Sequence, residues 1–256
     1  MKILEMRSAP NPRRVRIFLA EKGIEVPLEQ IDLTRGEHKQ PGFAKLNPMR
    51  HVPVLVLDDG TVIAETVAIC RYFECIRPEP ALFGRTPLEI ARTEMWSRRM
   101  EHSFWFHVQQ VFRHLHPAMA EAEVPQVPAW AEANRPRVYE TLCFMDNELA
   151  NRPFIAGEDF SIADITALVA VDFMKPAKLA RPAELVNLAR WYDAVSARPN
   201  AKAQGEDSRR DGEKCRDGVD MRWRKRQGRS GLPSRRASPI VQVAAFRRVS
   251  THSSAG

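Results

Sequence analysis

The stretch Arg50-His51-Val52-Pro53-Val54-Leu55-Val56-Leu57 decides the fold of this chain. Its β-branched apolar residues, which end at Asp58-Asp59-Gly60, predict a buried strand followed by a tight turn. Proline cannot donate a hydrogen bond to a strand ladder, so we expect the strand to begin at Pro53 and the Val52–Pro53 bond to be cis. The backbone N–H and C=O groups of Val52 then stay unpaired, which makes them available to another extended peptide.

Around this stretch, strand and helix patterns alternate over the first 77 residues. The expected elements are a strand at 2–6, a helix from the 8–12 loop to Gly23, a strand at 26–31, a loop with at most a short helix at 34–45, the strand at 53–57, a strand at 61–64 and a helix from Glu65-Thr66 to Pro78. Ser8 and Asn11 are residue types that cap helix starts. This order predicts a thioredoxin-like domain over residues 1–80.

Strand patterns stop after a linker at 81–86, and residues 87–203 predict an all-helical domain. The expected helices cover 88–116, 130–149, a stretch from 160 through Phe173, and 183–196. Ser161 and Asp164 form a capping box at the start of the third helix, and Phe160 and Ile165 occupy the two positions of a hydrophobic staple.

The basic character of the chain lies at its C-terminal end. Residues 204–256 hold 13 Lys and Arg against 6 Asp and Glu, which accounts for the whole net charge of +7, so residues 1–203 are balanced. The composition of 204–256 predicts a disordered basic tail. Its Arg222–Arg226 segment is able to contact nucleic acid or an acidic membrane surface. An abnormal extension, such as out-of-frame translation, explains the tail equally well, and nucleic acid is not an expected partner.

No apolar run approaches the ~20 residues that span a bilayer, and the charged N-terminus does not fit a secretory signal. The spacing of the cysteines fits neither a zinc site nor a CxxC pair. The spacing of the four histidines in the expected helix over 88–116 does not group them on one helix face. These residues are Cys70, Cys75, Cys143, Cys215, His102, His107, His114 and His116. We therefore expect no metal, no membrane partner and a cytoplasmic location.

Together these motifs resemble the cytosolic glutathione S-transferases, in particular the bacterial theta-, zeta- and nu-like branches. The resemblance rests on Asn47-Pro48 through Val52-Pro53, on Glu65-Thr66 twelve residues on, and on Phe160-Ser161-Ile162-Ala163-Asp164, and it covers about residues 1–203. It implies a homodimeric transferase of detoxification. The first domain would bind glutathione as co-substrate, and the helical domain would hold a hydrophobic electrophile.

The resemblance places the cysteinyl part of glutathione on the Val-Pro loop and its γ-glutamyl end on the helix that follows. Val52 and Pro53 would present a backbone edge to the cysteinyl amide of glutathione. Glu65 and Thr66 would bind the γ-glutamyl end at a helix N-terminus, where backbone N–H groups and the helix dipole favour a carboxylate. In isolation, a Glu-Thr pair is explained by helix capping alone.

Two histidines complete the expected binding residues, and two arginines lie at the start of the first helix. His38 and His51 match positions near the glycyl carboxylate of glutathione, and both side chains are able to donate hydrogen bonds to an anion. The alternative is a pair of exposed loop histidines. Arg13 and Arg14 either add positive potential or lie on a solvated helix face, and we favour the solvated face.

Catalysis requires a hydrogen bond that lowers the pKa of the glutathione thiol. In the family, the donor is a Tyr, Ser or Cys at the end of the first strand. Matching Ser-x-Pro places this donor at Ser8, whereas matching the Pro-Asn-x-Arg-Arg-Val run places it at Ala9, which has no hydroxyl. Asn11 fits an asparagine that reaches the sulfur in nu-like members. Ser8 and Asn11 are therefore the candidate catalytic residues, and backbone N–H stabilisation remains open.

The expected helix over 88–116 is rich in aromatic residues, namely Trp96, Phe104, Trp105, Phe106 and Phe112. Core packing explains most of them, and one or two are expected to face the electrophile. Two other functions stay open for this chain. One is a glutathione-dependent disulfide or peroxide reductase on the same scaffold, and the other is a non-catalytic transferase-like binding protein.

Overall fold

A computed structural model describes residues 1–203 of the chain, and the expectations for the basic tail at 204–256 lie outside this range. The first part is a thioredoxin-like domain, as predicted. Its elements are β1 (Lys2–Glu5), α1 (Pro10–Lys22), β2 (Leu28–Gln30), η1 (Glu37–Lys39), α2 (Pro41–Leu46), β3 (Val54–Val56), β4 (Val62–Ala64) and α3 (Thr66–Ile76). The segment 34–45, expected to be a loop with at most one short helix, contains a 3-10 helix and most of a short α-helix.

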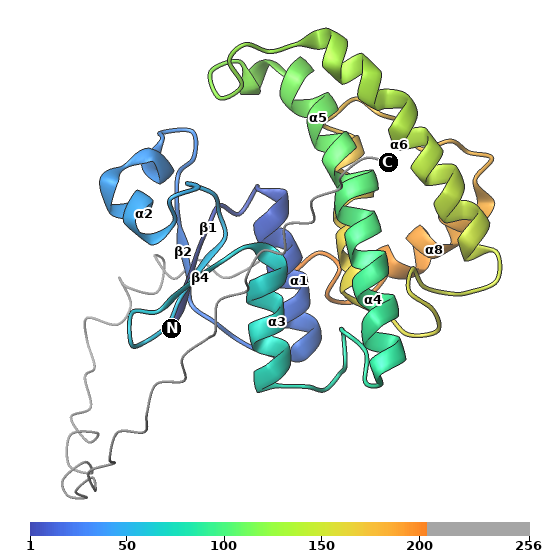
Figure 1. Ribbon diagram of the computed structural model, residues 1–256, viewed down its shortest axis with the longest axis horizontal. Helices are drawn as coiled ribbons and strands as arrows, with labels where there is room; N and C mark the ends of the chain where they lie inside the picture. The colour runs from blue at the N-terminus through green and yellow to red at the C-terminus, as the bar shows by residue number, and fades with distance from the viewer. Residues whose placement is uncertain (204–256) are drawn as a thin grey trace, which may run out of the picture. The chain divides into compact units, whose positions relative to one another are not determined.

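The four strands form one sheet in the order β2-β1-β3-β4, in which β1 and β2 are parallel and the other pairs antiparallel. The alternation of side chains along β1 and β3 creates two apolar faces. Ile3 and Leu55 face the main core with α1 and α3, while Leu4 and Val54 face a smaller core with Phe43 of α2. Figure 1 shows α1 and α3 on one side of the sheet and α2 on the other.

The second part is helical, as predicted. Its elements are α4 (Pro87–Arg99), η2 (Met100–Trp105), α5 (Phe106–Leu115), η3 (Pro117–Met119), α6 (Pro128–Leu149), α7 (Ile162–Met174) and α8 (Val186–Ser196). The predicted helix over 88–116 is continuous, but its middle segment η2 is π-helical. The last helix begins at Val186 rather than at residue 183, with Leu185 as its N-cap residue.

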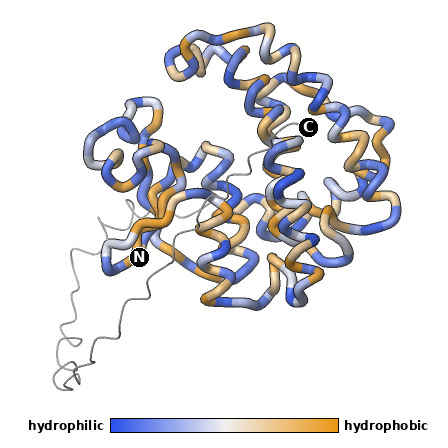
Figure 2. The backbone as a smooth tube through the Cα atoms, in the orientation of Figure 1, coloured by the Kyte–Doolittle hydropathy of each residue, from blue (hydrophilic) through white to orange (hydrophobic). Residues whose placement is uncertain are grey.

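The start of α7 is fixed by the predicted capping box. Asp164 is fully buried, and its carboxylate accepts hydrogen bonds from the backbone and hydroxyl of Ser161, from Ile155 N (2.8 Å) and from Trp191 Nε1 (2.9 Å). Burial raises the pKa of the Asp164 carboxyl, while these four donors favour its ionised form. The box thereby joins α7, α8 and the loop before α7 into one unit. Figure 2 shows the strands of the first domain in the hydrophobic colour, as their place in the core requires.

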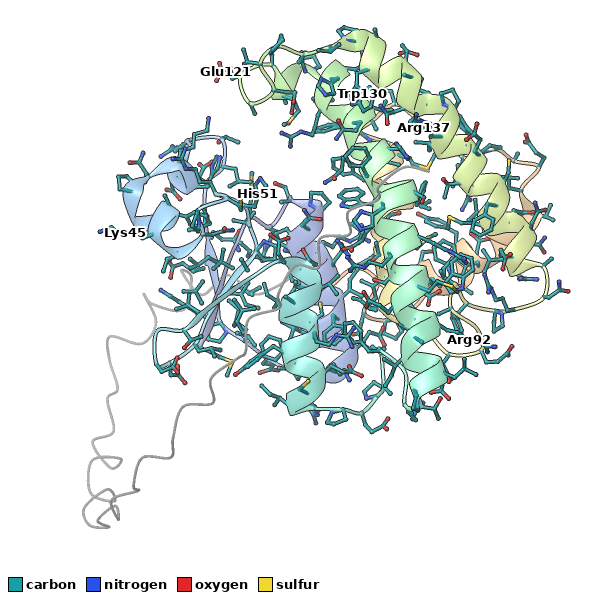
Figure 3. The ribbon with its side chains drawn as sticks, in the orientation of Figure 1. Lys45, His51, Arg92, Glu121, Trp130 and Arg137 are labelled. Atoms are coloured by element: carbon teal, nitrogen blue, oxygen red, sulfur yellow. The ribbon has the colours of Figure 1, made fainter. Side chains whose placement is uncertain are left out.

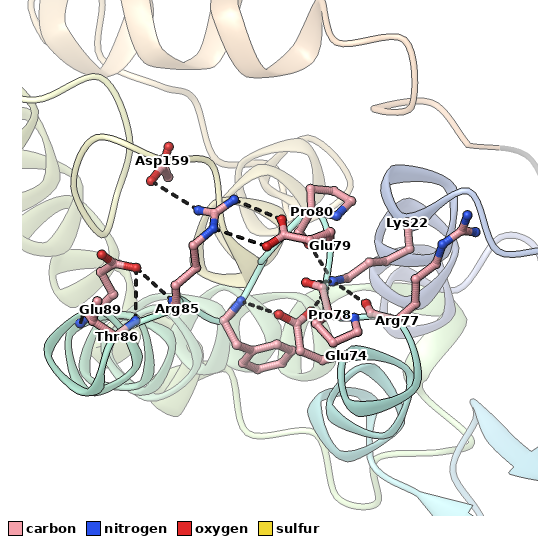
Figure 4. A network of polar contacts seen from close by, with 11 residues as sticks. Lys22, Glu74, Arg77, Pro78, Glu79, Pro80, Arg85, Thr86, Glu89 and Asp159 are labelled. Carbon is pink, nitrogen blue, oxygen red and sulfur yellow. Dashed lines mark hydrogen bonds and ion pairs between the residues drawn. The ribbon is translucent and has the colours of Figure 1, made fainter.

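A lysine of α1 binds the connection between the two domains through hydrogen bonds. Lys22 is buried, and its Nζ donates to the carbonyl oxygens of Arg77 and Pro78, each at 2.9 Å, and to that of Pro80, while it also pairs with Glu74 (Figure 4). These bonds satisfy carbonyls of the segment that follows α3. The linker boundary at 81–86 remains a prediction.

A buried arginine joins α1 to the helical domain. Arg14 has 3% of its side chain exposed, and its Nη2 lies 2.6 Å from Glu101 Oε1 in η2 and 2.9 Å from Thr166 Oγ1 in α7. The prediction that Arg14 lies on a solvated helix face is therefore wrong. The reason is that α1 lies between the sheet and the helical domain, so both of its sides are covered (Figure 1).

Candidate active site

The Val52–Pro53 bond is cis, as the sequence predicts. Neither the N–H nor the C=O of Val52 is hydrogen-bonded to another residue within 1–203. The loop before it is held by Asn47, which is 3% exposed and which donates through Nδ2 to His51 O (2.9 Å) and accepts at Oδ1 from Met49 N (3.0 Å). The side chain of Val52 is buried in the smaller core. The residue therefore offers a fixed, unpaired backbone edge.

The start of α3 provides a second binding feature. Glu65 has φ +71°, a conformation that L-residues rarely adopt and that is typical of functional sites. Its side chain does not cap the helix, so the explanation by capping alone is wrong for this residue. The N–H groups of Thr66, Val67 and Ala68 and the hydroxyl of Thr66 make no hydrogen bond within the described residues. These four donors suit a carboxylate.

The two predicted histidines lie on the same side of the first domain. His38, in η1, is partly buried, and its Nδ1 is enclosed without a hydrogen-bond partner among residues 1–203. Burial, and then the charges of Lys39, His51 and Arg50, lower the pKa of His38. His51 is exposed and, in Figure 3, faces the hairpin between α5 and α6. An anion between these side chains would meet positive potential from several directions.

The first turn of α1 contains the predicted catalytic residues. Neither Ser8 nor Asn11 caps the helix, because Ala9 is the N-cap residue and its own N–H donates to Met6 O at 2.9 Å. Ser8 is exposed in the preceding turn, whereas Asn11 is partly buried with its Oδ1 enclosed and unpartnered.

Prolines 10 and 12 carry no N–H group, and Arg13 N donates to Ala9 O, so Asn11 has the backbone N–H of this turn that makes no hydrogen bond within residues 1–203. The Pro-Asn-Pro spacing identifies Asn11 as the residue that would supply the backbone N–H stabilisation left open by the sequence.

Aromatic side chains line the helical domain near α1. The ring of Phe173 in α7 lies 5.2 Å from that of Trp105 and 4.8 Å from that of Phe112, which in turn stacks on His116 at 4.6 Å. We call Trp105, Phe112, His116 and Phe173 the aromatic row. Trp96 and Phe104 are buried core residues, and Phe106 is exposed. Rings of this kind bind flat apolar molecules by stacking and edge contacts.

No group of three His, Cys, Asp or Glu side chains within residues 1–203 is placed to hold a metal ion. His107 contacts Asn134 Oδ1 at 2.6 Å, and His114 accepts from Val127 N at 3.1 Å. In this same part of the chain, no helix combines the length and the apolarity that crossing a membrane requires.

A hollow between the start of α4 and the loop before α7 contains none of the predicted site residues. Its Arg85 lies between Glu79 (3.0 Å) and Asp159 (3.9 Å), so that its charge is already balanced (Figure 4). We therefore take Val52, the start of α3 and the first turn of α1 as the candidate active site.

Comparisons with known proteins show the family of this chain. Residues 9–75 match the model of the glutathione S-transferase N-terminal domain, and residues 108–199 match that of the C-terminal domain. Glutathione S-transferase 2 of Saccharomyces cerevisiae is 38% identical over 79% of this chain and 88% of its own length.

Solved structures agree as well. The structure of Gtt2 from the same yeast covers 79% of this chain and 99% of its own, at 38% identity and a TM-score of 0.76. A Gtt2-class transferase of Vibrio parahaemolyticus covers 80% of this chain and 96% of its own, at 34% identity and a TM-score of 0.71. The chain therefore belongs to the glutathione S-transferase family.

Proposed function

We propose that this transferase binds glutathione in an extended form across Val52, α3 and η1. The observation that carries the proposal is the pair of unpaired features on one domain: the backbone edge of Val52 and the free N-terminus of α3. The cysteinyl amide would form two strand-like hydrogen bonds with Val52, next to the cis bond to Pro53. The γ-glutamyl carboxylate would accept from Thr66, and Glu65 would accept from the γ-glutamyl amine.

The opposite end of glutathione is assigned to the histidines. The glycyl carboxylate would lie between His38 and His51, where the enclosed Nδ1 of His38 lacks a partner among residues 1–203. An anion favours the charged form of a histidine, so binding and protonation of His38 should support each other. Lys39 and Arg50 add positive charge around this position.

The sulfur would then lie at the first turn of α1, within reach of Asn11 and Ser8. Of the two, Asn11 is the better supported donor, because it is partly buried and combines a side-chain amide with a free backbone N–H. Both groups would stabilise the thiolate and lower the pKa of the thiol. Ser8 remains the second candidate, since its exposed hydroxyl is also able to donate.

The second substrate would be an apolar electrophile held against the aromatic row. In the reaction with an aryl chloride, the thiolate forms a carbon–sulfur bond, the carbon–chlorine bond breaks, and chloride leaves with the bonding electrons. The proton of the thiol goes to solvent. The protein contributes the thiolate and a position for the ring.

We also propose that the protein is a cytoplasmic homodimer. Ile76 at the end of α3 and Leu88 at the start of α4 are 55% and 59% exposed, so these apolar side chains are available to an interface between copies. Light scattering of the purified protein measures the mass directly. A mass that corresponds to one chain at micromolar concentration would refute the dimer.

Retention on immobilised glutathione, followed by conjugation of chlorodinitrobenzene, tests the proposed function. We expect retention that free glutathione reverses, and a conjugation rate above that of the uncatalysed reaction. Truncation after Lys202 should leave both intact. Failure of the full chain to bind glutathione at neutral pH would refute the proposal, and binding without conjugation would indicate a non-catalytic role.

A further inference from the structure

A partly buried arginine of the helical domain has no acidic partner among residues 1–203. The guanidinium of Arg181 lies over the ring of Tyr192 at 4.4 Å, and its Nη1 is enclosed and makes no hydrogen bond within residues 1–203. No carboxylate of the described residues forms an ion pair with Arg181. A buried donor that stays unpaired costs free energy, so this position favours an acceptor that the described part of the chain does not provide.

The carboxylate that contacts Tyr192 is already used by other groups. Asp172, in the last turn of α7, accepts from Tyr192 Oη at 2.6 Å with one oxygen and pairs with Arg13 Nη1 at 2.7 Å with the other. Arg13 and Arg181 both act on Tyr192 electrostatically. We call Arg13, Asp172, Arg181 and Tyr192 the Arg181 cluster. It holds two positive charges against one negative charge, so an excess of one positive charge remains.

The Arg181 cluster shares helices α7 and α1 with the aromatic row and with the expected position of the sulfur. Asp172 precedes Phe173, whose ring contacts Trp105 and Phe112. Arg13 lies one turn after Ala9, where the sulfur of glutathione is expected. An aromatic molecule on the row would therefore have the reacting sulfur on one side and a positive charge on another.

We propose that the Arg181 cluster binds the carboxylate of an aromatic electrophile whose ring lies on Phe112 and Phe173. The inference rests on the proposed transferase function and adds the substrate class: anionic rather than neutral aromatic electrophiles. The planar guanidinium of Arg181 is suited to this role, because it pairs with a carboxylate through two parallel hydrogen bonds while it stacks on a ring.

The test compares two aryl chlorides, chlorodinitrobenzene and its carboxylated analogue chlorodinitrobenzoate, each corrected for its uncatalysed rate. We expect Arg181→Gln to lower kcat/KM for chlorodinitrobenzoate about tenfold, equivalent to about 1.4 kcal/mol. The kcat/KM for chlorodinitrobenzene should change less than twofold. Lys175→Gln, which removes an exposed charge at the end of α7, is the matched control and should leave both values unchanged.

Equal losses for both chlorides in Arg181→Gln, or equal effects of Arg181→Gln and Lys175→Gln, would overturn the inference. If Arg181→Gln does not fold, competition in the wild type decides. Unreactive dinitrobenzoate should then inhibit at least fivefold more tightly than dinitrobenzene, and equal inhibition would refute the cluster's role. Wild-type protein that conjugates neither chloride would refute the proposed function itself.

Discussion

The assignment of Asn11 as the thiolate donor leads to a quantitative prediction for Asn11→Ala. The substitution removes the side-chain amide but keeps the backbone N–H of the turn. A hydrogen bond to a charged group contributes about 1.5–3 kcal/mol, and one pKa unit corresponds to about 1.36 kcal/mol. Because Asn11 is only partly buried and the backbone donor remains, we take the lower end and expect the pKa of the bound thiol to rise by about one unit.

The effect on the conjugation rate should reverse with pH. Below both pKa values, the thiolate fraction falls about tenfold for each unit, while the nucleophilicity of the thiolate rises about threefold, since the Brønsted coefficient is about 0.4–0.5. The net loss is about threefold. Above both pKa values the sulfur is fully ionised in either protein, so that the variant should be faster by about threefold.

Ultraviolet absorbance of the bound thiolate, titrated with pH, measures the pKa directly, and single-turnover rates with chlorodinitrobenzene measure the reversal. Ser8→Ala is measured beside it, because Ser8 is the second candidate donor and lies exposed in the turn just before α1. An unshifted thiol pKa in Asn11→Ala would refute the role of Asn11. A shift in Ser8→Ala instead would identify Ser8 as the donor.

Three further predictions concern the surroundings of the site. Glu101→Gln should lower the free energy of unfolding by about 3 kcal/mol, because Arg14 stays buried without its carboxylate. Urea denaturation should show this loss, and the double variant with Arg14→Met should recover part of it. Thr66→Val should raise KM for glutathione about tenfold with little effect on kcat or on the melting temperature, because one hydroxyl donor to the γ-glutamyl carboxylate is lost. An unchanged KM would contradict the assignment of that carboxylate to Thr66. Burial lowers the pKa of His38, and a bound carboxylate favours its charged form, so calorimetry should show affinity for glutathione rising as pH falls towards that lowered pKa. His38→Gln should abolish this dependence.

Most of the fold follows from local patterns in the sequence. Alternation over Val54-Leu55-Val56 and the Asp-Gly turn determine the hairpin, since both signals act within a few residues. The capping box at Ser161 acts equally locally. The π-helical turn at Met100–Trp105 could not be predicted, because the chain is amphipathic and helical on both sides and a shift of hydrogen bonding leaves no residue pattern.

The candidate site was also predictable only where it depends on local sequence. Pro53 and the Glu65-Thr66 pair mark backbone features, which a single sequence reveals. The burial of Arg14 and the pairing of Arg13 with Asp172 depend on helices that meet only in the folded chain. Long-range contacts of this kind have no signature in local spacing, and so the sequence favoured a solvated face for both arginines.

The two faces of the sheet differ in how strongly they are held, and this difference has a dynamic consequence. The main core runs through α1, α3 and the helical domain, whereas α2 is attached through the small cluster around Leu4, Phe43, Val52 and Val54. Segments with few buried contacts open locally at a lower free energy than the global unfolding. The segment around α2 should therefore exchange its amide hydrogens through independent openings. A peptide bound to Val52 and His38 would suppress these openings, so part of its binding energy is used to order the very loop that recognises it.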